Sequence, residues 1–248
     1  MRLQARLFLC ALQFLTRLPT PALKTWPENG VARSAPYYPV VGWIVGGLCA
    51  LVLLIADRIW PPLIGAALST VMGILVTGGL HEDGLADTAD GLGGGRTPER
   101  RREIMKDSRI GAYGVLALGS MLTLKTLAIA ALPPPQAALA LVLCHGAARA
   151  FAALAMTLPY AGDPGRAKLG AARASPVAAA LAALLGFVAL TLLPWPRAAL
   201  GLALAALAAG LIAHTARRLI GGWTGDVLGA VEQVAEVGLL LGVGAGLA

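Results

Sequence analysis

Seven long apolar stretches constrain the fold of this chain more than any other feature of its sequence. A helix needs roughly 20 apolar residues, with about 17–25 tolerated, to cross a bilayer. Each stretch is long enough, and we place the seven at 38–56, 62–80, 111–132, 136–158, 177–195, 198–216 and 227–248. Only 13% of the 248 residues are charged, about half the share found in soluble domains. The sequence therefore excludes an ordinary soluble enzyme. It predicts an all-α, polytopic membrane helical bundle of about seven transmembrane helices, forming one domain over 1–248.

The Lys and Arg residues are distributed unevenly between the connections. Sixteen of the 20 lie before residue 38 or in the long connections 81–110, 159–175 and 217–226, whereas the short connections hold only Arg58 and Arg197. Cytoplasmic connections of membrane proteins carry an excess of Lys and Arg. We therefore expect the N-terminus and the long connections on the cytoplasmic side of a bacterial inner membrane. The segment 3–18 has an apolar face flanked by arginines, which predicts an interfacial helix; a cleaved signal peptide is the alternative.

The connection 81–110 holds seven of the 13 acidic residues in the chain. If it is helical, Asp83, Asp87 and Asp90 project from one face, because residues three and four apart are neighbours on a helix. Three carboxylates on one stripe repel one another. A hard divalent cation such as Mg²⁺, which prefers oxygen ligands, would remove that repulsion. We therefore predict a cytoplasmic helical connector that binds Mg²⁺; a solvated acidic loop is the alternative.

The same connection becomes basic toward its end. Lys106 and Arg109 flank Asp107 and Ser108 just before a predicted span, while the arginine run 100–102 is assigned mostly to membrane orientation. Acidic metal ligands followed by cationic donors suit a polyphosphate, with the metal on one side and the cations on the other. The chain has no GxSxG or HExxH motif, so the pattern favours phosphoryl transfer over acyl transfer.

A second group of polar residues, 221–226, precedes the last span. Its glycine pair, Gly221 and Gly222, is typical of a helix end, and Asp226 is placed to cap the helix that follows. This structural role does not exclude a role for Asp226 in a functional site.

Two glutamates, Glu232 and Glu236, lie four residues apart inside the last predicted span. Ionisable residues are costly there and usually face a partner or a wet cavity. Arg149 in the fourth span is the first candidate partner. Lys125 in the third span is a weaker one, because a long lysine side chain can extend to the membrane interface.

The segment from Gly78 to Gly91, GGLHEDGLADTADG, resembles the signature of the membrane-bound cobalamin synthases, the adenosylcobinamide-GDP ribazoletransferases. Residues 105–114 and 221–226 resemble the second and third motifs of that family, and 16–19, Arg149 and Glu236 also fall at matching positions. The resemblance covers almost the whole chain. Glu82 replaces an apolar residue expected in the signature, so it is left out of the ligand set, and Glu232 has no clear counterpart.

The resemblance implies a late step of cobalamin (vitamin B12) biosynthesis. The adenosylcobinamide-phosphate group of adenosylcobinamide-GDP would pass to α-ribazole or its 5′-phosphate in an Mg²⁺-dependent reaction. GMP would be released, and adenosylcobalamin or its 5′-phosphate would form. The lipid bilayer is a further partner, no nucleic acid is expected, and homo-oligomers or contacts with neighbouring corrinoid-pathway enzymes are left open.

On this basis the candidate residues receive roles. Asp226 completes the metal site or accepts the proton of the ribazole hydroxyl. His81 is the other candidate base, although on a helix it points away from the aspartates. The metal ligands are Asp83, Asp87 and Asp90; the phosphate-binding residues are Lys106, Arg109, Arg17, Arg149 and Ser108; Asp107 and Glu236 are further candidates.

Two other functions remain as alternatives. One is a membrane phosphotransferase of the CDP-alcohol type, whose motif also begins with Asp-Gly, although Asp87 stands here where that motif has an arginine. The other is a membrane ion or solute transporter, which would be expected to concentrate polar residues and broken helices near the bilayer midplane.

Overall fold

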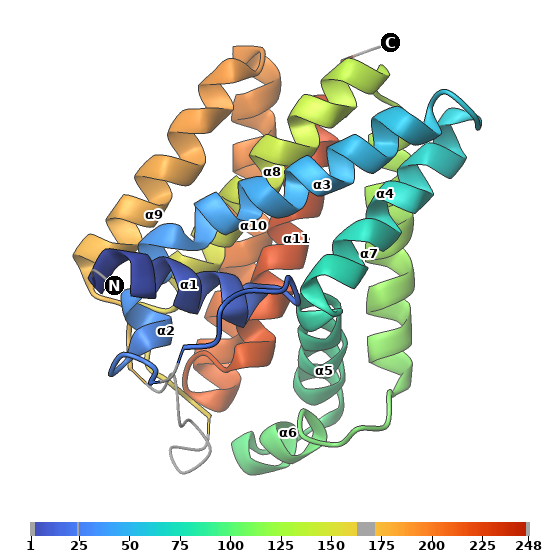
Figure 1. Ribbon diagram of the computed structural model, residues 1–248. Helices are drawn as coiled ribbons and strands as arrows, with labels where there is room; N and C mark the ends of the chain where they lie inside the picture. The colour runs from blue at the N-terminus through green and yellow to red at the C-terminus, as the bar shows by residue number, and fades with distance from the viewer. Residues whose placement is uncertain (1–2, 24, 163–171, 247–248) are drawn as a thin grey trace.

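Apart from one isolated β-bridge, helices make up all the regular structure in residues 3–23, 25–162 and 172–246, the ranges that the computed structural model describes. The predicted all-α class is confirmed (Figure 1). The elements in chain order are α1 (Leu3–Leu15), α2 (Gly30–Arg33), η1 (Ala35–Tyr37), α3 (Tyr38–Ala56), α4 (Pro62–Thr77), α5 (Leu80–Gly94), α6 (Pro98–Ile104), α7 (Ala112–Ala130), α8 (Pro134–Ala155), α9 (Pro176–Val188), η2 (Ala189–Leu192), α10 (Trp195–Ile220) and α11 (Gly225–Gly244). Residues 247–248 of the last predicted span, and Arg166 and Lys168 of the connection 159–175, lie outside the described ranges.

Five helices in the described ranges are long and apolar enough to cross a membrane, namely α3 with the turn before it, α7, α8, α10 and α11. The predicted spans 62–80 and 177–195 form shorter helices. The first ends at Thr77, and α4 and α5 together qualify as a sixth span that is bent by 89°. The second ends at Leu192, because Leu193 precedes Pro194 and takes the extended conformation that a following proline favours. The structure therefore supports five or six of the seven predicted spans.

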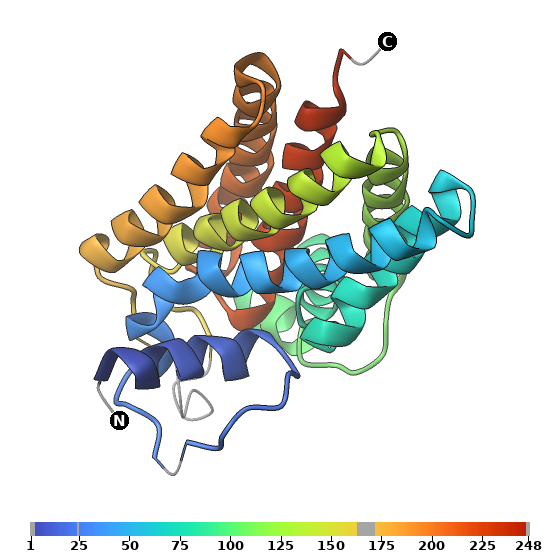
Figure 2. The same ribbon diagram turned by 45° about the horizontal axis from the view of Figure 1, so that its top comes forward.

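The N-terminal segment forms the 13-residue helix α1, too short to cross a bilayer. Its buried side chains, among them Leu7, Leu12 and Leu15, face the protein. Figures 1 and 2 both show α1 lying along the outside of the bundle beside the first half of α3. A helix is confirmed for residues 3–15 of the predicted 3–18, and its apolar face packs on the bundle.

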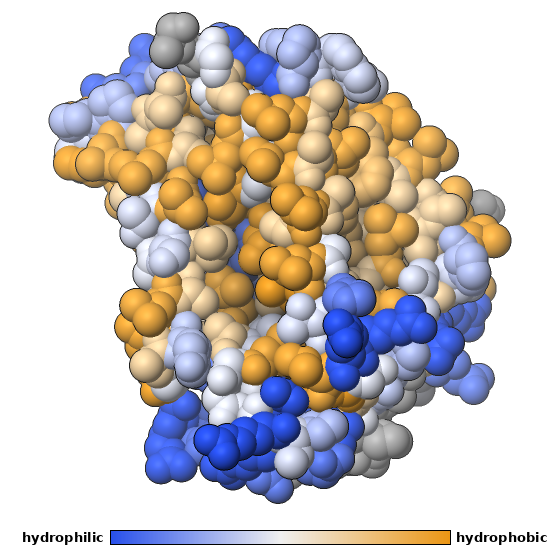
Figure 3. Space-filling model, turned by 180° about the vertical axis from the view of Figure 1, so that it is seen from behind, coloured by the Kyte–Doolittle hydropathy of each residue, from blue (hydrophilic) through white to orange (hydrophobic). Residues whose placement is uncertain are grey.

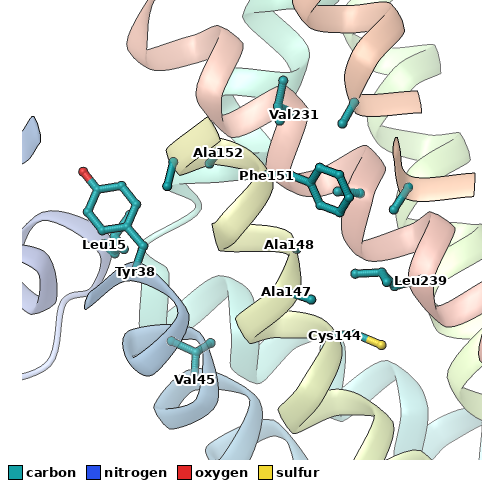
Figure 4. Packing of buried hydrophobic residues seen from close by; sticks show 14 of the residues in the cluster. Leu15, Tyr38, Val45, Cys144, Ala147, Ala148, Phe151, Ala152, Val231 and Leu239 are labelled. Carbon is teal, nitrogen blue, oxygen red and sulfur yellow. The ribbon is translucent and has the colours of Figure 1, made fainter. Parts of the chain in front are cut away.

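The helices α8 and α11 form the centre of the bundle, with 78% and 83% of their most apolar stretch buried. Gly42 and Gly46 on α3 pack directly on the backbone of α8, where an added Cβ would collide with carbonyl oxygens. Small residues at helix crossings allow this close approach in membranes. Figure 4 shows Tyr38 and Val45 of α3 on one side of α8, and Leu239 of α11 on the other.

On the face shown in Figure 3, hydrophobic residues cover most of the middle, while hydrophilic residues gather toward the two ends. The outward side chains include Leu75, Leu116 and Leu207, which are 66%, 67% and 72% exposed. A band of exposed leucines suits contact with lipid tails. The short connections after α3, α7 and α9 lie at the end opposite α6 (Figure 1), in agreement with the predicted alternation of short and long connections.

Candidate active site

A sharp bend after α4 begins the site. Gly78 and Gly79 both have φ of 70°, in the left-handed region that glycine enters without steric cost. The backbone N–H of Arg17 donates to the carbonyl of Val76 at 2.7 Å. The Arg17 side chain packs on Gly78, where an added Cβ would lie 2.6 Å from its Nε. The bend therefore brings Arg17 beside the start of α5.

A cavity of about 610 Å³ opens between this bend, α5 and the chain after α6. We call it the first cavity. It gathers six predicted site residues that lie far apart in the sequence: Arg17, Asp83, Asp87, Lys106, Asp107 and Ser108. The other residues that line it are Gly78, Gly79, Leu80, Ala86, Met105, Ile110 and Leu118.

Asp83 and Asp87 form the acidic wall of the first cavity, one helical turn apart on α5. This helix is too short and too acidic to span a membrane by itself. Burial, followed by the nearby carboxylates of Asp83, Asp226 and Asp90 in that order, raises the pKa of Asp87 to about 7. A carboxyl group crowded in this way gains from a bound cation, and an all-oxygen donor set fits Mg²⁺.

Asp226 reaches this acidic wall from the other end of the chain. Gly84 on α5 lies against the backbone of Asp226, and an added Cβ there would come within 2.7 Å of the Asp226 carbonyl oxygen. Asp83 and Asp226 also border a smaller cavity of about 110 Å³ between α1, α5 and α11. Gly84 thus allows α5 and α11 to approach closely enough to bring Asp83 and Asp226 to the same cavity.

Asp226 does not cap α11, contrary to the structural role that the sequence suggested. Thr224 is the N-cap, and its hydroxyl accepts from the N–H of Val227 at 3.3 Å. The same hydroxyl donates to Asp226 Oδ2 at 3.2 Å. The cap therefore leaves the Asp226 carboxylate facing the site.

Asp90 has a different environment from its two predicted partners. Its Oδ2 accepts from the N–H of Gly111 at 2.7 Å, and its Oδ1 accepts from the N–H of Gly114 at 2.9 Å. Both donors belong to the start of α7, and Asp90 does not line the first cavity. Its position favours satisfying the first N–H groups of α7 over binding the predicted metal.

Arg109 itself does not line the first cavity. Its side chain is 87% exposed and pairs with Asp107 at 2.7 Å between Nη2 and Oδ2. Hydrogen bonds from Arg109 lower the pKa of Asp107 to about 2. The predicted contact of Arg109 with phosphate is not supported by this arrangement, whereas Lys106 and Ser108 do line the cavity.

A buried ion cluster lies between α5, α7, α8 and α11. Arg149 Nη1 is 2.8 Å from Glu232 Oε1, and Lys125 Nζ is 2.7 Å from Glu236 Oε1. The predicted pairing of Arg149 with a glutamate of the last span is confirmed for Glu232. Lys125, expected to be the weaker partner, is 2% exposed and equally close. The cluster holds α11 against its neighbours, since breaking a buried pair leaves an uncompensated charge.

Three predicted site residues, Arg149, His81 and Glu236, belong to this cluster. Arg149 and Glu236 do not line the first cavity, so the phosphate role predicted for Arg149 is not supported. His81 Nδ1 lies 3.7 Å from Glu232 Oε2, and His81 also borders the smaller cavity of about 110 Å³ together with Asp83 and Asp226. Its burial, with 4% of its surface exposed, counts against His81 as the base.

The ion cluster also contains the one group of three ligand atoms within 4.8 Å of one another among the described residues, from His145, Glu232 and Glu236. Both glutamates there already pair with buried cations, which opposes a metal ion. Asp83 and Asp87 line the first cavity, and Asp83 and Asp226 border the smaller cavity of about 110 Å³. An open, carboxylate-lined cavity suits Mg²⁺, which typically takes one or two carboxylates and completes its shell with water and substrate phosphates.

A second cavity, of about 170 Å³, lies beside the first and shares Met105 and Lys106 with it. One wall is a short backbone pairing: Trp223 N–H donates to the Pro159 carbonyl at 2.9 Å, and Ala161 N–H donates to the Trp223 carbonyl at 2.8 Å. The described residues that line it are Arg102, Met105, Lys106, Tyr160, Gly162, Thr224, Gly225 and Asp226.

Sequence reasoning missed Tyr160 and assigned Arg102 to membrane orientation. The local sequence around Tyr160 carries no motif that singles it out. Only the polar segment 221–226, which contains its bridge partner Trp223, stands out in the sequence. Met105 was noted only as part of a motif, although it lines both cavities.

A helical membrane bundle with an acidic wall and cationic side chains around one polar cavity suits a membrane-bound transferase. The family model described as Cobalamin-5-phosphate synthase matches residues 7–244, and the chain belongs to this family. The predicted family and the predicted class of enzyme are thereby confirmed.

Three curated relatives are each called adenosylcobinamide-GDP ribazoletransferase. The protein from Leptothrix cholodnii is 45% identical over 98% of this chain and 97% of its own length. Those from Bradyrhizobium diazoefficiens and Ralstonia nicotianae are 46% and 40% identical, over 93% and 92% of this chain and 90% of each relative. No solved structure matches the chain.

Proposed function

We propose that this protein transfers the adenosylcobinamide-phosphate group of adenosylcobinamide-GDP to α-ribazole or its 5′-phosphate and releases GMP. The first cavity is the observation that carries the proposal. It combines two adjacent carboxylates with Arg17, Lys106 and Ser108, as recognition of a metal-bound pyrophosphate requires. The names of the relatives supply the substrates.

Asp83 and Asp87 would hold Mg²⁺, and Asp226 is the next carboxylate available to it. When bound, the ion would neutralise negative charge on the pyrophosphate of the donor. The crowding that raises the pKa of Asp87 to about 7 supports this assignment.

The cationic residues of the cavity stabilise the charge of the reacting phosphates. Arg17 and Lys106 neutralise the phosphate oxygens, and the Ser108 hydroxyl donates a hydrogen bond to them. A ribose hydroxyl oxygen of the acceptor forms a bond to the cobinamide-side phosphorus. The bond from that phosphorus to the bridging oxygen breaks, and GMP leaves with the electron pair.

Asp226 accepts the proton of the attacking hydroxyl. It borders the second cavity and lies close enough to Asp87 to raise its pKa. His81 is a poorer base, because it is 4% exposed and faces Glu232 across the ion cluster.

We further infer that the site faces the cytoplasm from a bacterial inner membrane. The basic helix α6 lies at the same end of the bundle as α5 and the start of α11 (Figure 1). The excess of Lys and Arg in the connections at this end supports the cytoplasmic orientation.

Purified protein in liposomes tests the proposal directly. With adenosylcobinamide-GDP, α-ribazole and Mg²⁺, we expect GMP release in amounts equal to the corrinoid product, and none without either substrate. Release of CMP from a CDP-alcohol would favour the CDP-alcohol type instead. Uptake of a solute into the liposomes with no nucleotide released would favour the transporter, whose class also contains broken helices and buried charges.

A further inference from the structure

A groove of about 300 Å³ lies between α8 and α10 and shares no residue with the first or the second cavity. Both helices pack on α11, and the groove opens between them. We call it the membrane groove. Among the described residues no charged side chain lines it; those that do are Phe151, Leu154, Ala155, Thr157, Leu158, Ala206, Ala209, Gly210, Ala213 and Val231.

Small residues form the α10 side of the membrane groove. Positions 206, 209, 210 and 213 are three and four residues apart, so they share one face of the helix. A Cβ added to Gly210 would meet no atom within 4 Å, so the space beside it is open. The neighbouring Leu207 and Leu211 are exposed on the outer surface. The membrane groove is therefore accessible from the bilayer along about 10 Å of α10, given a rise of about 1.5 Å per residue.

The membrane groove lies in the half of the bundle nearer to α6. Most of its α10 residues belong to the second half of that helix, and Val231 is in the second turn of α11. The end of α10 and the start of α11 lie at the end of the bundle where α6 is found (Figure 1). An acyl chain in this groove would therefore belong to the leaflet nearer to α6.

A positive charge stands at the α6 end of the membrane groove. Arg217 lies on the α10 face that lines the groove, four residues after Ala213. Helical side chains lean toward the N-terminus of their helix, which favours an extension of the Arg217 side chain toward the groove. Arg217 is exposed and makes no hydrogen bond or ion pair with any described residue. Because α10 also contains no acidic residue, this charge has no counter-charge on its own helix.

An apolar groove that ends at a cation matches the two parts of a phospholipid. An acyl chain in the groove would gain van der Waals contacts with Phe151, Leu154 and the small residues of α10. The guanidinium of Arg217 would donate hydrogen bonds to the phosphodiester oxygens. An anionic headgroup is favoured, because the choline group of a zwitterionic lipid would bring a second cation close to Arg217.

We propose that the membrane groove binds one anionic phospholipid of the leaflet nearer to α6, with an acyl chain along Gly210 and the phosphodiester on Arg217. This lipid is a ligand distinct from the substrates of the proposed reaction. The proposal therefore does not depend on that reaction, and its test needs no turnover.

Native mass spectrometry of the purified full-length protein, titrated with lipid in detergent, measures the binding. Phosphatidylglycerol and phosphatidylcholine with identical acyl chains are the two probes. We expect the first phosphatidylglycerol molecule to bind about fivefold more tightly than phosphatidylcholine, or tighter still. One arginine near an anionic headgroup contributes an attraction of this order.

Arg217→Gln should remove this preference. It should raise the Kd for phosphatidylglycerol about fivefold and leave the Kd for phosphatidylcholine unchanged. Arg218→Gln is the matched control, because it removes the same charge from the next residue, which is rotated by about 100° around the helix. This control should leave both Kd values unchanged.

Gly210→Leu fills the membrane groove, since its Cβ enters open space, and leucine is the better helix former. It should weaken the binding of both lipids about tenfold or more, while the Tm of the protein stays the same or rises. Gly119→Leu is the control, because a Cβ added to this glycine of α7 likewise meets nothing within 4 Å. It should bind both lipids as the wild type does.

Three results would overturn the assignment: equal affinity of the wild type for the two lipids, equal effects of Arg217→Gln and Arg218→Gln, or unchanged lipid binding by Gly210→Leu. Size-exclusion chromatography tests another occupant. A wild type that is dimeric, together with a monomeric Gly210→Leu variant, would show that a second copy of the chain fills the groove in place of a lipid.

Discussion

The ionisation of Asp87 is coupled to the other carboxylates of the site. Its pKa of about 7 arises from burial and from the carboxylates of Asp83, Asp226 and Asp90. Below pH 7 a proton therefore occupies the group that a metal ion would need, and above pH 7 the carboxylate is free to bind it.

The Mg²⁺ requirement should consequently depend on pH. The Mg²⁺ concentration that gives half-maximal GMP release should rise about tenfold for each pH unit below 7, since proton and metal compete for one carboxylate. It should change little between pH 8 and pH 9. Titrations at pH 6, 7 and 8 measure this, and a half-saturation value independent of pH would contradict the assignment.

Asp90 should affect stability more than metal binding. Its two bonds to N–H groups at the start of α7 are the kind whose loss costs about 1 kcal/mol. Asp90→Ala should therefore lower the Tm of the purified protein while leaving the Mg²⁺ half-saturation near the wild-type value. A large rise in the Mg²⁺ requirement with an unchanged Tm would restore Asp90 as a ligand.

The spacing of Asp83 and Asp87 made their shared face predictable, because a helix repeats every 3.6 residues. The same rule placed Asp90 on that face. It could not show that the N–H groups at the start of α7 donate hydrogen bonds to the Asp90 carboxylate. Tyr160 and Arg102 escaped prediction for a related reason. The pairing of residues 159–161 with 223 brings Tyr160 to the second cavity, where Arg102 of α6 also lies, and no local sequence pattern encodes this pairing.

At the scale of elements, the close packing of α5 on α11 positions the carboxylates of Asp83, Asp87 and Asp226. Gly84 makes this contact without a side chain. Gly84→Ala should push the helices apart and lower kcat at least tenfold, because small displacements of catalytic groups have large effects on rate. Gly119→Ala, on α7 with nothing within 4 Å of its added Cβ, is the control for a helical glycine. Equal activity of the two variants would show that the contact is not needed.

The apolar pattern predicted where helices form better than how many of them cross the bilayer. The stretch 62–80 was long enough to span, yet Gly78 and Gly79 turn the chain by 89° into α5. Hydropathy averages over a window and does not register such a turn. The ion pairs of α11 could be predicted in part. The cost of burying Glu232 and Glu236 implied cationic partners, and Arg149 was the expected one. That Lys125 pairs equally closely follows only from the packing of the helices.

For the whole molecule, the charge distribution predicts a single orientation in the membrane. The three native cysteines are buried. A thiol reagent should therefore react mainly with a cysteine introduced at the surface. In right-side-out membrane vesicles, a membrane-impermeant thiol reagent should label Arg58→Cys and not Arg100→Cys. Permeabilised vesicles, in which both should react, are the control. Labelling of Arg100→Cys alone would reverse the proposed orientation.

The central claim is that the first cavity, with Asp83 and Asp87 on its wall, is where phosphoryl transfer occurs. GMP release by Asp87→Asn at saturating Mg²⁺ tests it most directly, with Asp57→Asn as control because Asp57 lies in the connection between α3 and α4, at the opposite end of the bundle. We expect Asp87→Asn to reduce kcat by about a hundredfold or more, as losing a group that stabilises transition-state charge does. Asp57→Asn should retain wild-type activity. Near wild-type GMP release by Asp87→Asn would contradict the account.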